Sequence, residues 1–213
     1  MKIIDLTHTI KEDMPVYPGT EPPSLKRANT IESDGFAELL LTMYSHTGTH
    51  IDAPCHMISA AKSLSDFAAD KFVGKACVLD FTGIGSSEIV LSDIVAHEDN
   101  ISKSDFVLIR TGWDKYWGRD SYFEGFPVLS PDAARWLASF DIKGVGIDAI
   151  SVDGVGSETF DVHFSFMQKE IIIIENLANL DYIEDEFFIL SILPLKLHGA
   201  DGSPVRAVAI VGA

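Results

Sequence analysis

The stretch SPDAARWLASFDIKGVGIDAI, residues 130–150, joins a helix pattern directly to a strand pattern. Ser130 is a typical helix N-cap, and Pro131 suits the first helical position, where its missing N–H leaves no hydrogen bond unmade. The run GVGIDAI at 144–150 is apolar at nearly every position, which is typical of a strand covered on both faces. A helix that leads into such a strand indicates an α/β fold. The apolar face of the helix would carry Trp136, Leu137 and Phe140.

The rest of the chain repeats this alternation. Weaker helix patterns occupy 91–98 and 161–169, while 85–90 and 151–160 have the composition of connecting loops. Neither an internal repeat nor a Gly/Ser-rich linker divides the sequence. We therefore predict one α/β domain over residues 1–213, with a mixed β-sheet and flanking helices. The other predicted strands are 2–7, 37–47, 75–81, 105–111, 170–176, 187–195 and 205–212.

The composition restricts the class of protein. The chain has 213 residues, with 32 acidic and 16 basic side chains and a formal net charge of −16. This charge disfavours nucleic acid and anionic membranes, because Lys and Arg hold both. The apolar runs are too short to span a bilayer as a helix, and the N-terminus lacks the apolar segment of a secretion signal, so we expect a cytoplasmic protein. Cys55 and Cys77 are expected to be free thiols.

A second stretch, SHTGTHIDAPCHM at 45–57, concentrates groups that bind metals or transfer protons. In an extended chain these groups would all point to one side, because their residue numbers are all even. A straight strand would nevertheless spread the first and third of them over about 20 Å, at ~3.3 Å per residue. We therefore predict a strand that runs into a tight loop, with bends at Gly48 and Pro54. The groups are His46, His50, Asp52 and His56.

We interpret this cluster as a metal site. The alternative is a polar turn with hydrogen-bonded histidines, which a single His would favour but this combination does not. Imidazole with carboxylate suits Zn²⁺, Mn²⁺ or Fe²⁺, and Cys55 beside the cluster is a possible soft ligand. His163 and Glu175 are candidate partners, although Glu175 could instead be a strand-end acid that reaches solvent. The histidines not expected to be ligands are His8, His97 and His198.

The motif HTGTHIDAPCH, residues 46–56, resembles the H-x-G-T-H-x-D-x-P-x-H signature of the cyclase-like metal hydrolases, which include bacterial kynurenine formamidase and isatin hydrolase. The resemblance implies a swivelling β/β/α-type domain, dimeric or tetrameric, with one or two divalent metal ions, Zn²⁺ or Mn²⁺, per subunit. It covers nearly the whole chain, because further segments resemble the family in the right order. They are DLTHTIKEDMPVYPG (5–19), RTGWDKYW (110–117), GIDAISVD (146–153) and LPLKLHGADGSPVRAVA (193–209).

The same resemblance implies a role for each candidate ligand. His46, His50 and Asp52 resemble the ligands of a first metal ion. Asp52 and Glu175 resemble carboxylates that can bridge two metal ions, and His163 resembles the second ion's own ligand. The resemblance thus favours ligation over solvent exposure for Glu175.

His56 resembles the proton donor and acceptor of the family. Tyr17 stands where the kynurenine formamidases have a Trp that contacts the aromatic substrate, and Tyr can also stack on a ring. The implied reaction is hydrolysis of an amide C–N bond by metal-activated water, with N-formylkynurenine giving kynurenine and formate. A cyclic amide such as isatin, or a lactone, is the alternative substrate.

Two other functional classes and one segment stay open. A non-haem iron oxygenase also uses two His and one carboxylate, but that chemistry needs no second carboxylate and histidine set. A metal-binding module without catalysis has no use for the additional base at His56. The aromatic segment 112–126 could wall a pocket or cover a neighbouring subunit's site, or it could simply pack.

Overall fold

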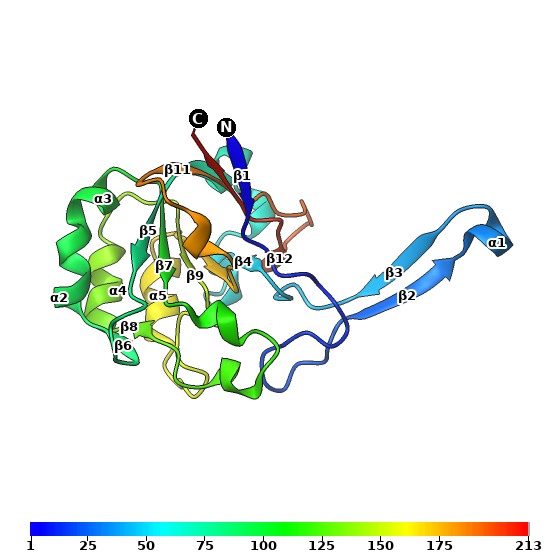
Figure 1. Cartoon of the computed structure of the whole chain (residues 1–213), viewed down its shortest axis with the longest axis horizontal. Helices are drawn as coiled ribbons and strands as arrows, with labels where there is room; N and C mark the ends of the chain where they lie inside the picture. The colour runs from blue at the N-terminus through cyan, green and yellow to red at the C-terminus, as the bar shows by residue number, and fades with distance from the viewer. Residues whose placement is uncertain (213) are drawn as a thin grey trace.

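The computed structural model describes residues 1–212 and contains one large curled sheet with helices packed against it (Figure 1). The sheet has nine strands in the order β1-β13-β11-β5-β7-β9-β10-β4-β12. Strands β5, β7, β9 and β10 run parallel to their neighbours within that group, and all other neighbours are antiparallel. The predicted mixed sheet is therefore confirmed. The strands are β1 Lys2–Asp5, β4 His50–Asp52, β5 Val73–Asp80, β7 Phe106–Arg110, β9 Gly144–Ile147, β10 Ile172–Glu175, β11 Phe188–Ser191, β12 Gly202–Pro204 and β13 Val208–Val211.

Four of the helices gather on one face of this sheet (Figure 1). The helix expected after Ser130 is confirmed as α4, since the Ser130 side chain accepts a hydrogen bond from the backbone N–H of Ala133 at 3.2 Å. The helix pattern at 91–98 is divided by a 3₁₀ turn, and the pattern at 161–169 forms a shorter helix. These helices are α2 Leu91–Ile94, α3 Glu98–Ser102, α4 Pro131–Leu137 and α5 Asp161–Met167.

Both faces of the sheet centre are covered. On β7, Val107 and Ile109 belong to the apolar cluster under the helices, while Phe106 and Leu108 belong to a second cluster on the opposite side. Alternate residues of a strand point to opposite faces, so a strand between two apolar layers is apolar throughout. This arrangement explains why the central strands could be recognised as apolar runs.

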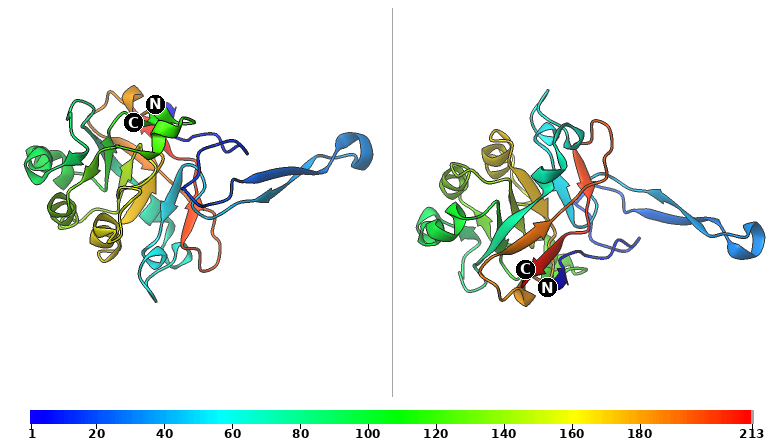
Figure 2. Two further views of the ribbon diagram at one scale, coloured as in Figure 1. Left: turned by 90° about the horizontal axis from the view of Figure 1, so that it is seen from below. Right: turned by 90° about the horizontal axis from the view of Figure 1, so that it is seen from above.

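The strand predicted at 37–47 is shorter than expected and lies outside the large sheet. Only Glu38–Thr42 form a strand, β3, which pairs with β2 Ser24–Asn29. With α1 Ile31–Asp34 between them, they form an arm, residues 24–42, that projects from the body (Figures 1 and 2). All of β3 is exposed, so the burial that we expect of an apolar run is absent. An apolar run does not reveal whether its own chain covers it.

The remaining predicted strands are confirmed with shorter limits, except that β5 begins two residues before the predicted strand 75–81 and is one residue longer. Four strands were not predicted, because they are polar or very short: β2, β4, β12 and β8 Val128–Leu129. The predicted loop 85–90 contains a further short strand, β6 Glu88–Ile89, which pairs with β8. Over residues 1–212, none of the helices has the length and apolar character needed to cross a membrane. The 3₁₀ helices are η1 Pro54–His56, η2 Leu64–Asp66, η3 Ala69–Phe72, η4 Val95–His97, η5 Trp113–Tyr116, η6 Asp120–Phe123 and η7 Leu180–Tyr182.

Candidate active site

Two neighbouring strands make the floor of the candidate site. His50 and Asp52 lie on β4 and point to the same face, because they are two residues apart on a strand. Strand β10 pairs antiparallel with β4 and places Glu175 directly opposite His50. Cross-strand partners lie side by side on one face, so the imidazole and both carboxylates meet there. All three side chains are buried.

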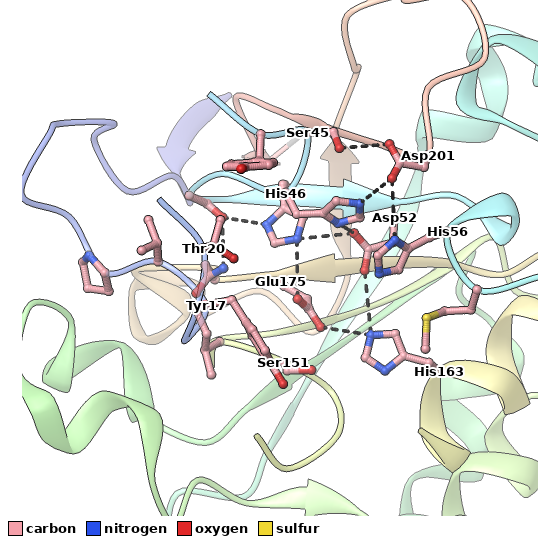
Figure 3. Close-up of a pocket in the computed structure, with 18 of the residues that line it drawn as sticks. Tyr17, Thr20, Ser45, His46, Asp52, His56, Ser151, His163, Glu175 and Asp201 are labelled. Atoms are coloured by element: carbon pink, nitrogen blue, oxygen red, sulfur yellow. Dashed lines mark hydrogen bonds and ion pairs between the residues drawn. The ribbon is translucent and has the colours of Figure 1, made fainter. Parts of the chain in front are cut away.

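A loop, a turn and a helix add the other candidate groups (Figure 3). His46 lies in the loop before β4, where Gly48 has a φ of +65°, a left-handed conformation that favours glycine. His56 ends the 3₁₀ turn η1, and His163 projects from α5. Both predicted bends are therefore present, one at Gly48 and one at the start of η1.

The two carboxylates lie between the histidines. Asp52 Oδ1 is 2.6 Å from His46 Nδ1 and 3.3 Å from His50 Nε2. Glu175 Oε2 is 3.5 Å from His50 Nε2, and its Oε1 is 3.5 Å from His163 Nε2. Asp52 Oδ2 lies 3.9 Å from the same nitrogen of His163. Glu175 thus lies near two histidines and Asp52 near three, which is an arrangement of groups that could share two metal ions.

Acceptors behind two of the histidines orient their rings. His50 Nδ1 lies 2.7 Å from the carbonyl oxygen of Gly48, and His163 Nδ1 lies 2.6 Å from Asp153 Oδ2. Neither acceptor is a donor, so each Nδ1 carries a hydrogen, and each Nε2 faces the carboxylates, where it can bind a metal ion when the ring is neutral. This tautomer is the one required of a metal ligand that binds through Nε2.

Asn176 supports the same region from behind. It follows Glu175 with a φ of +57°, and its side-chain N–H donates to the carbonyl oxygen of Gly48 at 3.0 Å. The Tyr122 hydroxyl donates to Asn176 Oδ1 at 2.8 Å. Tyr122 belongs to the aromatic segment 112–126, whose rings pack into the core beneath the helices. That segment therefore packs and supports the site from behind, and its side chains do not form the pocket wall.

The donor atoms fit a divalent cation. Asp52 Oδ1 is buried and accepts no hydrogen bond, although a nitrogen of His46 lies only 2.6 Å away. Such an orphaned buried oxygen is costly in a protein unless a cation satisfies it. Two sets of ligand atoms each lie within 4.8 Å of one another, one from His46, Asp52 and His56 and one from His50, Asp52 and Glu175.

The two buried carboxylates of the cluster also need positive charge close to them. Burial lowers the pKa of His46, but the carboxylates around it, Asp52 foremost, outweigh burial and raise the pKa to about 9. Burial raises the pKa of Glu175, and the neighbouring Asp52 raises it further. Burial opposes ionisation of Asp52 as well, yet His46 and His50 hold its pKa well below the usual range. Without a metal ion, protons must supply this charge.

Asp201 is a further acid at the rim that the sequence analysis did not single out. Its Oδ2 lies 3.3 Å from His46 Nε2 and 3.7 Å from His56 Nδ1, and its Oδ1 accepts a hydrogen bond from Ser45 Oγ at 2.9 Å. The next residue must be glycine, since a Cβ at Gly202 would stand 2.7 Å from the His46 ring. Asp201 and Asp153 both lie in irregular segments, where no periodic pattern marks them.

A pocket of about 450 Å³ opens above the cluster. Tyr17 lines it, and its hydroxyl donates to the carbonyl oxygen of Val155 at 3.2 Å. The structure thus places all the predicted site residues around one pocket (Figure 3). The apolar part of its wall is formed by Pro15, Val16, Met57, Ile150 and Phe160.

The other histidines lie elsewhere. The ring of His8 stacks on Trp117 with centroids 3.9 Å apart, His97 packs edge-on against Phe81, and His198 is exposed. The Cys55 thiol faces the carbonyl oxygen of Ala200 at 3.8 Å, and both cysteines are free.

Comparisons with known proteins agree with this architecture. A model of the family described as Putative cyclase matches residues 4–154. Kynurenine formamidase from Geobacillus thermodenitrificans (strain NG80-2) is 34% identical over 208 residues, covering 96% of this chain and 95% of the relative. Among solved structures, isatin hydrolase A from Labrenzia aggregata, bound to benzyl benzoate, superposes with a TM-score of 0.89 at 27% identity and covers 100% of this chain and 94% of its own.

A second solved structure, described as a predicted metal-dependent hydrolase from Bacillus stearothermophilus, has a TM-score of 0.81 at 33% identity. The match covers 98% of this chain and 97% of that one. The fold, the full-length similarity and the match over residues 4–154 agree with one another, and the chain belongs to the cyclase family.

Proposed function

We propose that the protein hydrolyses the amide C–N bond of an N-formylated arylamine, with N-formylkynurenine as the substrate to test first. It is a metal-dependent hydrolase that acts on a non-peptide C–N bond, as its kynurenine formamidase and isatin hydrolase relatives support. The observation that carries the proposal is the cluster of His50, Asp52 and Glu175 at the floor of a pocket with an apolar wall.

The residues around the floor would hold the metal. His46, His50 and Asp52 form one ligand set, and Glu175 with His163 extends it towards a second ion. A bound divalent cation would supply Lewis acidity, which activates water and polarises the substrate carbonyl. We propose Zn²⁺ or Mn²⁺, in one or two ions per subunit, because imidazole and carboxylate ligands suit both. The orientation of His50 and His163 by acceptors behind them supports this assignment.

His56 is proposed as the proton carrier. Its side chain is 30% exposed and lines the pocket next to the ring of His46. Burial lowers the pKa of His56 below its ordinary value, so the neutral ring accepts a proton from the attacking water and returns it to the leaving nitrogen. Asp201, which also lines the pocket, has its Oδ2 3.7 Å from Nδ1 of the His56 ring.

The pocket wall favours a substrate with a flat ring. Tyr17 offers a partly exposed aromatic face, and Phe160 and Met57 add apolar surface beside the cluster. An arylformamide would place its ring against this wall and its formyl carbon over the carboxylates. A cyclic amide of the isatin type is the second candidate, since its ring fits the same wall and solved relatives are isatin hydrolases.

We further propose a cytoplasmic homodimer or homotetramer. The exposed apolar arm supports assembly, because a single chain leaves it uncovered. The acidic composition disfavours partners such as nucleic acid or anionic membranes.

The test is formate release from N-formylkynurenine by metal-free protein reloaded with Zn²⁺ or Mn²⁺. Release that is lost in Asp52→Asn and kept in Asp70→Asn, a matched change at an exposed aspartate, would support the proposal. Replacing His56 by Ala should leave the metal content normal and lower turnover by roughly 10²–10⁴-fold. Loss of metal from that variant would make His56 a ligand. No release from folded, metal-loaded protein would reject the substrate, and opening of isatin would then be measured.

A further inference from the structure

His46 lies between two carboxylates, and its two ring nitrogens face different ones. Its Nε2 lies 3.3 Å from Asp201 Oδ2, and its Nδ1 lies 2.6 Å from Asp52 Oδ1 (Figure 3). An ionised carboxylate only accepts hydrogen bonds, and a neutral imidazole carries a hydrogen on one nitrogen and a lone pair on the other. The contacts around the ring therefore decide which nitrogen of His46 can bind a metal ion.

The contact with Asp201 has the geometry of a hydrogen bond, and the contact with Asp52 does not. Nε2 of His46 is hydrogen-bonded to Asp201 Oδ2. In contrast, Asp52 Oδ1 accepts no hydrogen bond from the described residues 1–212, although Nδ1 is the closer nitrogen. The hydrogen of the neutral ring therefore belongs on Nε2. Nδ1 and Asp52 Oδ1 then face each other with lone pairs, which is unfavourable unless a cation binds both.

Asp201 is held in place by contacts that do not involve His46. Its Oδ1 accepts a hydrogen bond from Ser45 Oγ at 2.9 Å, and its main-chain carbonyl accepts one from the N–H of Ala53 at 2.8 Å. The next residue, Gly202, pairs with Asp52 where β12 meets β4. The carboxylate thus has a fixed position beside β4, so it can impose an orientation on the more exposed ring of His46.

Gly202 makes this orientation possible. A Cβ at this position would stand 2.7 Å from both Cε1 and Nε2 of His46, so the edge of the ring that carries Nε2 lies close against the backbone of β12. The centroid of the His56 ring lies 4.0 Å from that of His46. The ring of His46 is therefore confined by its neighbours as well as hydrogen-bonded to Asp201.

The other two candidate ligand histidines have the opposite arrangement. Nδ1 of His50 faces the carbonyl oxygen of Gly48, and Nδ1 of His163 faces Asp153. In both rings it is Nε2 that faces the carboxylates of the cluster. His46 differs because its hydrogen-bond acceptor lies at Nε2.

We propose that Asp201 is a positioning residue: it accepts a hydrogen bond from Nε2 of His46 and so leaves Nδ1 of this histidine to bind the first metal ion. His50 and His163 bind through Nε2. The inference rests on the proposed function only in taking His46 as a metal ligand. Partners of this kind fix the orientation of a ligand ring and raise the basicity of its free nitrogen.

The first test observes the ring nitrogens directly. Protein with isotope-labelled histidine is loaded with Zn²⁺, and long-range proton–nitrogen NMR spectra distinguish metal-bound from protonated ring nitrogens. We expect one ligand histidine with metal on Nδ1 and hydrogen on Nε2, and the reverse pattern for the other ligand histidines. The first pattern should be lost in Asp201→Ala and kept in Asp70→Ala, a matched change at an exposed aspartate. Ligation of every histidine through Nε2 would overturn the proposal.

The second test measures Zn²⁺ affinity by competition with a chromogenic chelator. Asp201→Ala should weaken binding by about 10–100-fold relative to wild type and to Asp70→Ala. Asp201→Asn should weaken it less, because its amide oxygen can still accept the hydrogen bond from Nε2. Ser45→Ala removes the contact at Oδ1 but keeps the carboxylate, so its loss should also be smaller.

Three results of the affinity measurement would contradict the proposal. Equal losses in Asp201→Ala and Asp201→Asn would show that only the negative charge acts. An affinity equal to that of Asp70→Ala would make Asp201 structural, and loss of a whole equivalent of Zn²⁺ from Asp201→Asn would make it a ligand.

The proposed function can fail separately from this inference. Zn²⁺-loaded protein that shows the Nδ1 pattern but does not hydrolyse N-formylkynurenine would reject the substrate and retain the role of Asp201. Hydrolysis by protein in which His46 binds through Nε2 would retain the function and reject the role. A wild-type chain that binds no divalent metal ion would overturn both.

Discussion

His163 depends for the orientation of its ring on Asp153, a residue outside the metal's first contacts. Its ring nitrogen Nδ1 and its backbone N–H both point at one carboxylate oxygen of Asp153, at 2.6 and 3.0 Å. Burial raises the pKa of Asp153, but the hydrogen bonds from His163 outweigh it and lower the pKa below the usual value. The ionised carboxylate therefore fixes which nitrogen of His163 faces Glu175 and Asp52.

Asp153→Asn should weaken metal binding without unfolding the protein. The amide keeps the size of the side chain, but it loses the charge that favours the Nδ1–H tautomer of His163. We expect metal affinity, measured by competition with a chromogenic chelator, to fall by about 10–100-fold, the range typical of such supporting partners. The control is Asp161→Asn, since Asp161 opens the same helix but is exposed. Equal affinities in both variants would show that Asp153 only caps α5.

The candidate ligands could be predicted at this scale because four of them lie in one short segment with a common parity. These four residues could therefore be recognised without knowledge of the fold. Asp153 and Asp201 could not be predicted, since they come from irregular segments and reach the site only through tertiary structure. Glu175 could not be assigned from its place in the sequence alone. The family resemblance favoured ligation, and the pairing of β10 with β4 places Glu175 opposite His50.

At the scale of single elements, the turn after β7 is held by a buried carboxylate, that of Asp148. The backbone N–H groups of Thr111 and Gly112 donate to the carboxylate of Asp148 at 2.8 and 2.7 Å, which ties the end of β7 to the end of β9. Asp148 is 1% exposed, and burial raises its pKa to about 6 despite these hydrogen bonds.

This carboxyl group makes stability depend on pH in a particular direction. Below about pH 4 it is protonated in both states, and between about 4 and 6 only the folded state retains the proton. The free energy of unfolding therefore falls as pH rises through this window, and above about pH 6 it stays at the lower value. At 1.36 kcal/mol per pKa unit, the wild type should lose about 3 kcal/mol relative to Asp148→Asn between pH 4 and pH 7. Denaturant unfolding of both proteins measures this difference, and parallel curves would contradict it.

A helix or strand could be predicted well where its own sequence carries a strong local signal. Helix α4 was predictable to its first residue, because Ser130 and Pro131 are start signals that act without the rest of the protein. Strand β3 was recognised as a strand, but its place outside the sheet was not predictable. Its leucines resemble those of a core strand, and only the fold shows that nothing in the same chain covers them.

At the scale of the whole molecule, the sheet order joins segments that are far apart in the sequence. Strand β4 lies between β10 and β12, so the motif around residue 50 is held by strands near residues 173 and 203. The α/β class was predictable from the alternation of patterns, but this order was not, because pairing partners leave no local signature. The consequence is that the candidate metal cluster connects the first third of the chain with its last third.

Metal removal should therefore lower the stability of the whole fold. A ligand that binds only the folded state at 1,000 times its dissociation constant adds about 4.1 kcal/mol. A change of 1 kcal/mol shifts the midpoint by about 2–4 °C in a domain of this size, so the melting temperature should fall by roughly 8–16 °C on chelation. Without the ion, Asp52 and Glu175 remain buried side by side with only histidine protons to compensate them. The Asp52→Asn variant should have the same melting temperature with and without metal, measured by calorimetry. If chelation left the melting temperature of the wild type unchanged, the cluster would be stable as a hydrogen-bonded polar network, and the metal ion would not contribute to the stability of the strands around it.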